Sequence, residues 1–143
     1  MPEIKPFYTA HATAVGGRNG NTKSDDGLVD VNLSVPKAMG GPGKPDTTTP
    51  EHLFAAGYAA CFGGACEFMA KQMKMPMTTL AVHSEVTIGS IPSGFGLAVV
   101  LNVDVGGLSQ EDAEKVVAAG HKLCPYSNAI KGNVDVKLNV KVV

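Results

Sequence analysis

Residues 48–75, with the sequence TTPEHLFAAGYAACFGGACEFMAKQMKM, decide the fold expected for this chain. Threonine, proline and glutamate at 49–51 are a strong helix start, because the hydroxyl caps free N–H groups and proline suits the first turn. The next helix breaker is Pro76, so one helix is predicted to run to about residue 75. Its apolar stretch, residues 53–66, is shorter than the roughly 20 residues of a membrane span and indicates a buried helix.

Glycines at 57, 63 and 64 interrupt this helix, and each costs up to about 1 kcal/mol relative to alanine. Their presence predicts that another element packs very close to it. Spacing of three and four residues predicts one apolar face. That face is expected to hold Leu53, Phe54, Gly57, Tyr58, Cys61, Gly64, Ala65, Phe68 and Met69.

The remaining elements are predicted from alternation and capping. Period-two alternation indicates strands at residues 7–15, 29–35, 80–88, 97–105 and 134–142, the third and fourth forming a hairpin. Ser109 caps a second helix that runs through Leu123, and Pro125 breaks it. The predicted order is two strands, a helix, a hairpin, a second helix and a last strand. This order is typical of an α+β fold and not of an alternating βαβ fold.

Length and composition exclude several classes of protein. The 143 residues favour a single domain over 1–143, and 44% apolar residues are enough for a core. With 12 basic and 13 acidic residues, the chain has no electrostatic signature of a nucleic-acid or membrane partner. Three cysteines and four histidines lack metal-binding spacing, so we expect neither a metal nor a bound cofactor. Reduced cysteines and an N-terminus without a signal-like apolar stretch favour a cytoplasmic protein.

Cys61 lies on the apolar face, about three turns into the long helix. A buried thiol there ordinarily packs as a small apolar group, since desolvation raises its pKa and the helix dipole has faded. A reactive Cys61 therefore needs a cation from elsewhere in the fold. Arg18 is the only arginine and lies in a glycine-rich turn. A buried guanidinium needs a carboxylate, and Glu51 opens the same helix, although its ordinary role is to cap it.

Cys124 begins the motif CPYS at the helix break. Two cysteines far apart in sequence suit thiol peroxidase chemistry, in which a sulfenic acid on one condenses with the other. The alternative for Cys61 and for Cys124 is that the thiol is unreactive and only packs in the core. Cys66 projects roughly 140° away from Cys61 around the helix and is predicted to pack.

Four segments resemble the organic hydroperoxide resistance (Ohr) branch of the OsmC-like proteins. They are GGRNG at 16–20, DGLVDV at 26–31, PEHLFAAGYAACF at 50–62 and CPYSNAIKGN at 124–133. The similarity covers essentially the whole chain, and the two cysteine motifs are specific in combination.

The resemblance implies an OsmC-like α+β fold, with antiparallel sheets packed around two long central helices in an intertwined homodimer. It makes Cys61 the peroxidatic cysteine and Cys124 the resolving cysteine. Arg18 would stabilise the thiolate, and Glu51 would orient Arg18. Phe54 and Tyr126 are assigned to the substrate pocket.

The implied activity is a cytoplasmic, Cys-based peroxidase that reduces organic hydroperoxides, including those of fatty acids, to alcohols. A lipoylated protein or another dithiol would recycle it. Three alternatives stay open at this point: an OsmC-type peroxidase of broader specificity, a non-enzymatic carrier of apolar ligands, and a redox sensor.

Overall fold

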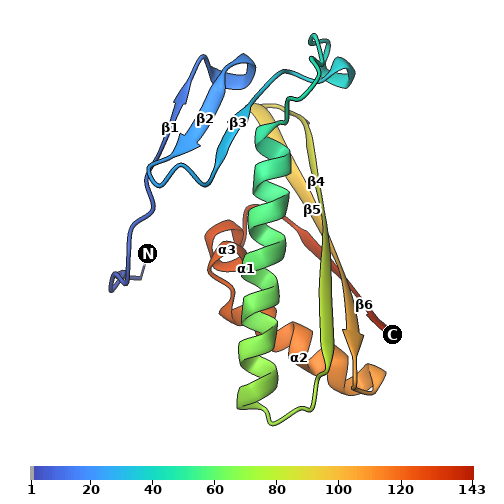
Figure 1. The fold of residues 1–143 in the computed structure, drawn as a ribbon. Coiled ribbons are helices and arrows are strands. Elements are labelled where there is room, and N and C mark those ends of the chain that lie inside the picture. Colours follow the sequence, from blue (N-terminus) through green and yellow to red (C-terminus); the bar gives the residue numbers. More distant parts are fainter. Residues whose placement is uncertain (1) are drawn as a thin grey trace. The chain divides into compact units, whose positions relative to one another are not determined.

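The structure is a computed structural model that describes residues 2–143. It divides into two compact units, residues 1–50 and 51–143, which are described separately. Figure 1 shows the elements of both units in chain order.

The first unit is a small antiparallel sheet of three short strands in the order β1-β2-β3. These strands are β1 (Ala12–Val15), β2 (Asn21–Ser24) and β3 (Asp30–Asn32), with two 3-10 turns, η1 (Gly17–Asn19) and η2 (Lys37–Met39). The prediction of a strand over 7–15 is wrong before Ala12, where Phe7 and Tyr8 are exposed and outside any strand. Strand β2 was not predicted, because its sequence NTKS has no apolar alternation.

In the second unit, α1 (Pro50–Gln72) is the long predicted helix, and it ends three residues early. Lys74 adopts a positive φ of 54°. The N–H of Met75 donates to the carbonyl of Ala70 (2.8 Å), and that of Lys74 donates to Lys71 (3.1 Å). These two bonds are a Schellman motif, which stops the helix before the proline that the prediction relied on.

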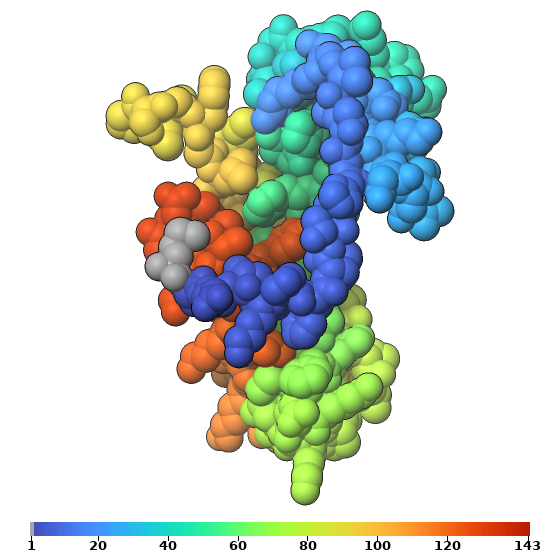
Figure 2. Space-filling model, turned by 90° about the vertical axis from the view of Figure 1, so that its left-hand side faces the viewer, coloured from blue at the N-terminus to red at the C-terminus, as the bar shows by residue number. Residues whose placement is uncertain are grey.

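A three-stranded sheet follows, formed by β4 (Thr79–Ile91), β5 (Gly94–Gly106) and β6 (Val136–Val142). The predicted hairpin is confirmed, with β4 antiparallel to β5. The expectation of antiparallel sheets is wrong for β6, which runs parallel to β5. Helices α2 (Gln110–Leu123) and α3 (Pro125–Ile130) connect these two strands, and such a crossover is what parallel pairing requires. The hairpin tip projects from the rest of this unit in Figure 2.

The core lies between α1, α2 and the inner face of the sheet. Its largest fully buried side chains are Tyr58, Phe62, Leu101, Val103, Val105, Val116, Val117, Cys66 and Cys124. Although α1 has the length and hydropathy of a membrane span, it is the core helix of this unit.

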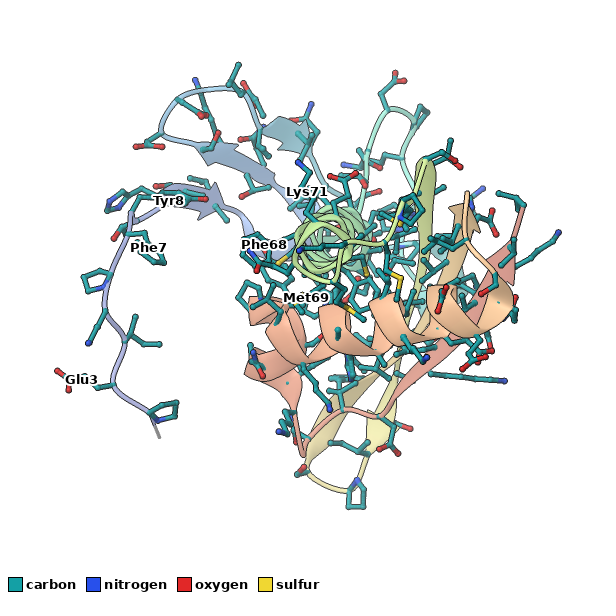
Figure 3. The ribbon with its side chains drawn as sticks, turned by 90° about the horizontal axis from the view of Figure 1, so that it is seen from below. Glu3, Phe7, Tyr8, Phe68, Met69 and Lys71 are labelled. Atoms are coloured by element: carbon teal, nitrogen blue, oxygen red, sulfur yellow. The ribbon has the colours of Figure 1, made fainter. Side chains whose placement is uncertain are left out.

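The predicted apolar face of α1 is only partly correct. Tyr58 and Ala65 are buried as expected, but Phe62 and Cys66, which were not assigned to that face, are buried as well. Phe68 is 52% exposed and projects from the last turns of the helix in Figure 3. The cause is that α1 is apolar around most of its circumference, so periodicity alone does not select the face that packs.

Candidate functional site

Helices α1 and α3 bring two cysteines together. The thiol of Cys124 donates to Sγ of Cys61 over 3.5 Å, and both cysteines are free. Cys124 lies between α2 and α3, where its N–H donates to the carbonyl of Gly120 (2.8 Å) and Pro125 begins the next helix. Because proline suits a first helical turn and cannot continue the previous helix, the Cys-Pro pair fixes the sulfur at this junction.

The two sulfurs differ in exposure. Cys124 is fully buried, whereas Cys61 is half-exposed. Burial raises the pKa of the Cys61 thiol, the backbone N–H of Tyr126 opposes that shift, and the neighbouring Cys124 adds to it. These influences favour the neutral Cys61 thiol at pH 7, and a thiolate there needs a nearby positive charge to stabilise it.

The helices that carry the two cysteines, α1 and α3, also carry a cluster of aromatic rings. The ring of Tyr58 lies 6.0 Å from Phe54, 6.3 Å from Phe62 and 5.9 Å from Tyr126, and Phe54 lies 6.3 Å from Tyr126. Both proposed pocket residues, Phe54 and Tyr126, thus belong to this cluster. Tyr126 is 42% exposed, so the cluster is open to solvent on that side.

The predicted close approach at the helix glycines holds at one of the three. A Cβ at Gly57 would lie 3.3 Å from the ring of Tyr126, so a side chain at 57 would crowd that ring. The nearest atom to a Cβ at Gly63 would be at 3.7 Å, an ordinary contact, and Gly64 faces open space within the described residues. Gly57 therefore lets α3 carry Tyr126 close to α1.

A chain of hydrogen bonds that joins α1, α3 and α2 was not predicted. The hydroxyls of Tyr58 and Ser127 are 2.6 Å apart, and Nδ1 of His121 lies 2.9 Å from Oγ of Ser127. Tyr58 and Ser127 are buried, and His121 is half-exposed. Ser127 was visible in the sequence as the last residue of the CPYS motif, but nothing in the sequence pairs it with residues 58 and 121.

Cys66 packs, as predicted. It is fully buried, and burial followed by the charges of Cys124 and Glu67 raises its pKa to about 12. A Cβ at Gly120 would lie 2.6 Å from its sulfur, so α2 crosses α1 at this point with no room for a side chain.

The other two predicted residues, Arg18 and Glu51, belong to η1 and α1. Arg18 is half-buried in η1 of the first unit. Glu51 is in the first turn of α1, where it lines a cavity of about 170 Å³ with His52, Ala55, Ser84 and Val86. The roles of Arg18 and Glu51 stay predictions. Within residues 2–143, no group of three or more His, Cys, Asp or Glu side chains is placed to hold a metal ion.

This fold and its pair of adjacent thiols define an OsmC-like protein. The family model described as "OsmC-like protein" matches residues 41–139. The organic hydroperoxide resistance protein of Xanthomonas axonopodis pv. citri is 48% identical over 137 residues, covering 95% of this chain and 96% of its own. The organic hydroperoxide resistance protein OhrB of Bacillus subtilis is 45% identical over 139 residues, covering 94% of this chain and 98% of its own.

A solved structure gives the same result. The crystal structure of an organic hydroperoxide resistance protein from Legionella pneumophila superposes with a TM-score of 0.92 at 48% identity, covering 96% of this chain and 100% of that one. The chain belongs to the OsmC/Ohr family of organic hydroperoxide resistance proteins.

Proposed function

We propose that this protein is a thiol-dependent peroxidase that reduces organic hydroperoxides, including those of lipids, to alcohols. Family membership implies Cys-based peroxidase activity in general terms. The observation that carries the specific proposal is the 3.5 Å separation of the Cys61 and Cys124 sulfurs, since a disulfide of about 2 Å forms from it by a shift of roughly 1.5 Å.

In the oxidative half of the cycle, the Cys61 thiolate attacks the distal oxygen of the hydroperoxide. The O–O bond breaks, the alkoxide leaves and takes a proton to become the alcohol, and Cys61 becomes a sulfenic acid. The sulfur of Cys124 then displaces the hydroxyl group, which leaves as water, and the Cys61–Cys124 disulfide forms. The half-exposed Cys61 is the sulfur that a peroxide reaches, and the buried Cys124 is protected from direct oxidation.

Arg18 is proposed to supply the positive charge that a Cys61 thiolate needs. A guanidinium near Cys61 would lower the thiol pKa and stabilise the negative charge that develops as the O–O bond breaks. Glu51, at the start of the helix that carries Cys61, would orient the guanidinium. Both units would then act as parts of one domain spanning 1–143.

The apolar surroundings favour bulky organic substrates. Phe54 and Tyr126 belong to the aromatic cluster on α1 and α3, the backbone N–H of Tyr126 bonds to Cys61, and neither these two rings nor the neighbouring Tyr58 ring carries a charge. We expect the protein to use cumene hydroperoxide more efficiently than hydrogen peroxide, because only the former buries apolar area on binding.

An external dithiol, such as a lipoylated protein, would reduce the disulfide by thiol–disulfide exchange, which needs no bound cofactor. The protein would act in the cytoplasm as a homodimer. The exposed apolar side chains of α1, with Phe68 at its far end, support a second copy as the cover for this helix.

Dithiol-dependent turnover of cumene hydroperoxide by purified variants tests the proposal. We expect no turnover from Cys61→Ser, and from Cys124→Ser an initial oxidation followed by overoxidation or cross-linking. Arg18→Ala should be severely slowed. Cys66→Ala is the matched control, since it removes a cysteine that packs, and it should keep turning over.

Turnover by Cys61→Ser would refute the peroxidatic assignment. A wild type that binds apolar ligands without consuming peroxide would instead be a carrier. Stoichiometric oxidation without steady turnover would indicate a sensor.

A further inference from the structure

One stripe of α1 holds Phe54, Gly57 and Cys61, because helical residues three and four positions apart share a face. Tyr126 of α3 lies along this stripe. Its backbone N–H bonds to Cys61, and the centre of its ring lies 6.3 Å from that of Phe54. Between these two contacts, the ring of Tyr126 crosses the helix at Gly57.

The ring of Tyr126 rests closer to α1 than a side chain at position 57 allows. A Cβ on Gly57 would lie 3.3 Å from Cε2 of that ring, 3.4 Å from Oη and 3.7 Å from Cζ. Ordinary contacts between carbon atoms are about 3.5–4.0 Å. Glycine is among the poorest helix formers, so its presence at this position serves the close approach of the ring and not the helix.

This contact lies beside the sulfur of Cys61. A helical side chain leans toward the N-terminus and covers the preceding turn, so the Cys61 thiol leans toward the turn that contains Gly57. Cys61 is half-exposed and Tyr126 is 42% exposed. A molecule that approaches the sulfur along this face of α1 therefore passes the ring of Tyr126.

Resting on the proposed peroxidase activity, we propose that Gly57 is a specificity-determining residue: it leaves room for the ring of Tyr126 against α1 and so keeps the approach to Cys61 wide enough for bulky organic hydroperoxides. The rings of Phe54 and Tyr58, on the same helix, lie 6.3 Å and 5.9 Å from that of Tyr126. A side chain at 57 therefore displaces the Tyr126 ring away from α1, toward solvent, where it narrows the approach. Hydrogen peroxide is small enough to pass in either case.

Substitutions at Gly57 test the proposal through the ratio of kcat/KM for cumene hydroperoxide to kcat/KM for hydrogen peroxide. Gly57→Ala requires the ring to move by roughly half an ångström or less. The branches of the side chain in Gly57→Val reach one bond of about 1.5 Å further, so the ring must move by more than about 1 Å. Because a misfit of one methylene in an apolar pocket is worth about tenfold or more, we expect Gly57→Val to lower the ratio roughly tenfold and Gly57→Ala roughly twofold to threefold.

Two controls separate this effect from general damage. Gly63→Ala makes the same change on the same helix, but its Cβ would lie an ordinary 3.7 Å from Val82, so the ratio should stay at the wild-type value. In a Tyr126→Ala background the ring is gone, so adding Gly57→Val should leave the ratio of that background unchanged. Circular dichroism checks that each variant is folded, and if Gly57→Val does not fold, Gly57→Ala with and without Tyr126→Ala decides.

A second readout does not depend on peroxide chemistry. N-methylmaleimide and N-phenylmaleimide alkylate thiols by the same reaction and differ in the size of one substituent. Mass spectrometry of the peptide that contains Cys61 gives the rate of alkylation by each reagent. Gly57→Val should slow the phenyl reagent roughly tenfold relative to the methyl reagent.

The proposal is overturned if either ratio, of kcat/KM values or of alkylation rates, stays at the wild-type value in the folded Gly57 variants. It is also overturned if Gly57→Val still lowers the ratio in the Tyr126→Ala background, since the effect would then not pass through the ring. A wild type that consumes no hydroperoxide would contradict the peroxidase proposal instead, and the two maleimides would decide the role of Gly57.

Discussion

Gly120→Ala tests the contact on which the position of Cys124 depends. A Cβ at this position would lie 2.6 Å from Sγ of Cys66 and 3.1 Å from both its Cα and its N atom. Ordinary contacts between heavy atoms are about 3.5–4.0 Å, so the first approach is roughly 1 Å too short. Two of the three neighbours are backbone atoms, which do not move aside by rotating a side chain.

The expected cost follows from two opposing effects. Overpacking of a core commonly costs about 1–3 kcal/mol, while alanine gains up to about 1 kcal/mol over glycine in a helix. We therefore expect a net loss of roughly 1–2 kcal/mol in the free energy of unfolding. For a chain of this length that corresponds to a fall in Tm of about 3–7 °C.

The substitution should also affect the chemistry. The carbonyl of Gly120 accepts the N–H of Cys124 (2.8 Å), so a displaced α2 moves the Cys124 sulfur relative to Cys61. Disulfide formation after peroxide addition should slow more than the initial oxidation of Cys61, since only the former needs both sulfurs in place.

Thermal and urea unfolding of the reduced protein, followed by circular dichroism, measure the stability. The double variant Gly120→Ala with Cys66→Ala removes the contact between the new Cβ and the Cys66 sulfur. Its loss in the free energy of unfolding should therefore be smaller than the sum of the losses of the two single variants by more than about 0.5 kcal/mol. If Gly120→Ala instead raised the stability, as alanine does at an open helical position, the close packing of α1 and α2 would be refuted.

Three further predictions follow from single features. Ser109 caps α2 by accepting the N–H of Asp112 (3.2 Å), so Ser109→Ala should lose about 1 kcal/mol of unfolding free energy in urea while Ser109→Asp keeps most of it. Because burial raises the pKa of Cys66 to about 12, iodoacetamide at pH 8 should label Cys61 and spare Cys66 in the folded protein; equal labelling would contradict this. Burial lowers the pKa of the His121 imidazole from 6.5, so as the pH falls the unfolded chain protonates this imidazole before the folded protein does. The free energy of unfolding should therefore decrease below about pH 6.5. His121→Asn should make the free energy of unfolding less dependent on pH in this range.

Local signals in the sequence predicted most elements of the second unit. The Ser109 cap, the break at Pro125 and the β4–β5 hairpin are confirmed, because each depends on chemistry within a few residues. The parallel pairing of β6 was missed because it depends on the crossover between β5 and β6. The first unit was predicted poorly, since its strands are only three or four residues long and none of their residues is buried.

The candidate site was likewise predicted only where the signal is local in sequence. Cys61 and Cys124 were singled out from their motifs, and the structure places their sulfurs 3.5 Å apart. The bond between Tyr58 and Ser127 was not predictable, since it joins residues 69 positions apart through two helices whose packing no local pattern encodes. The buried face of α1 was predicted only in part for a related reason: an almost uniformly apolar helix is oriented by what packs on it.

The most direct test of the central claim is peptide mapping of the wild type after one equivalent of cumene hydroperoxide, with alkylation of the remaining thiols. We predict a single intramolecular link between the peptides that contain Cys61 and Cys124, alkylation confined to Cys66 after denaturation, and one molecule of alcohol for each link. Recovery of sulfinic or sulfonic acid on Cys61 with Cys124 still free for alkylation would contradict the account.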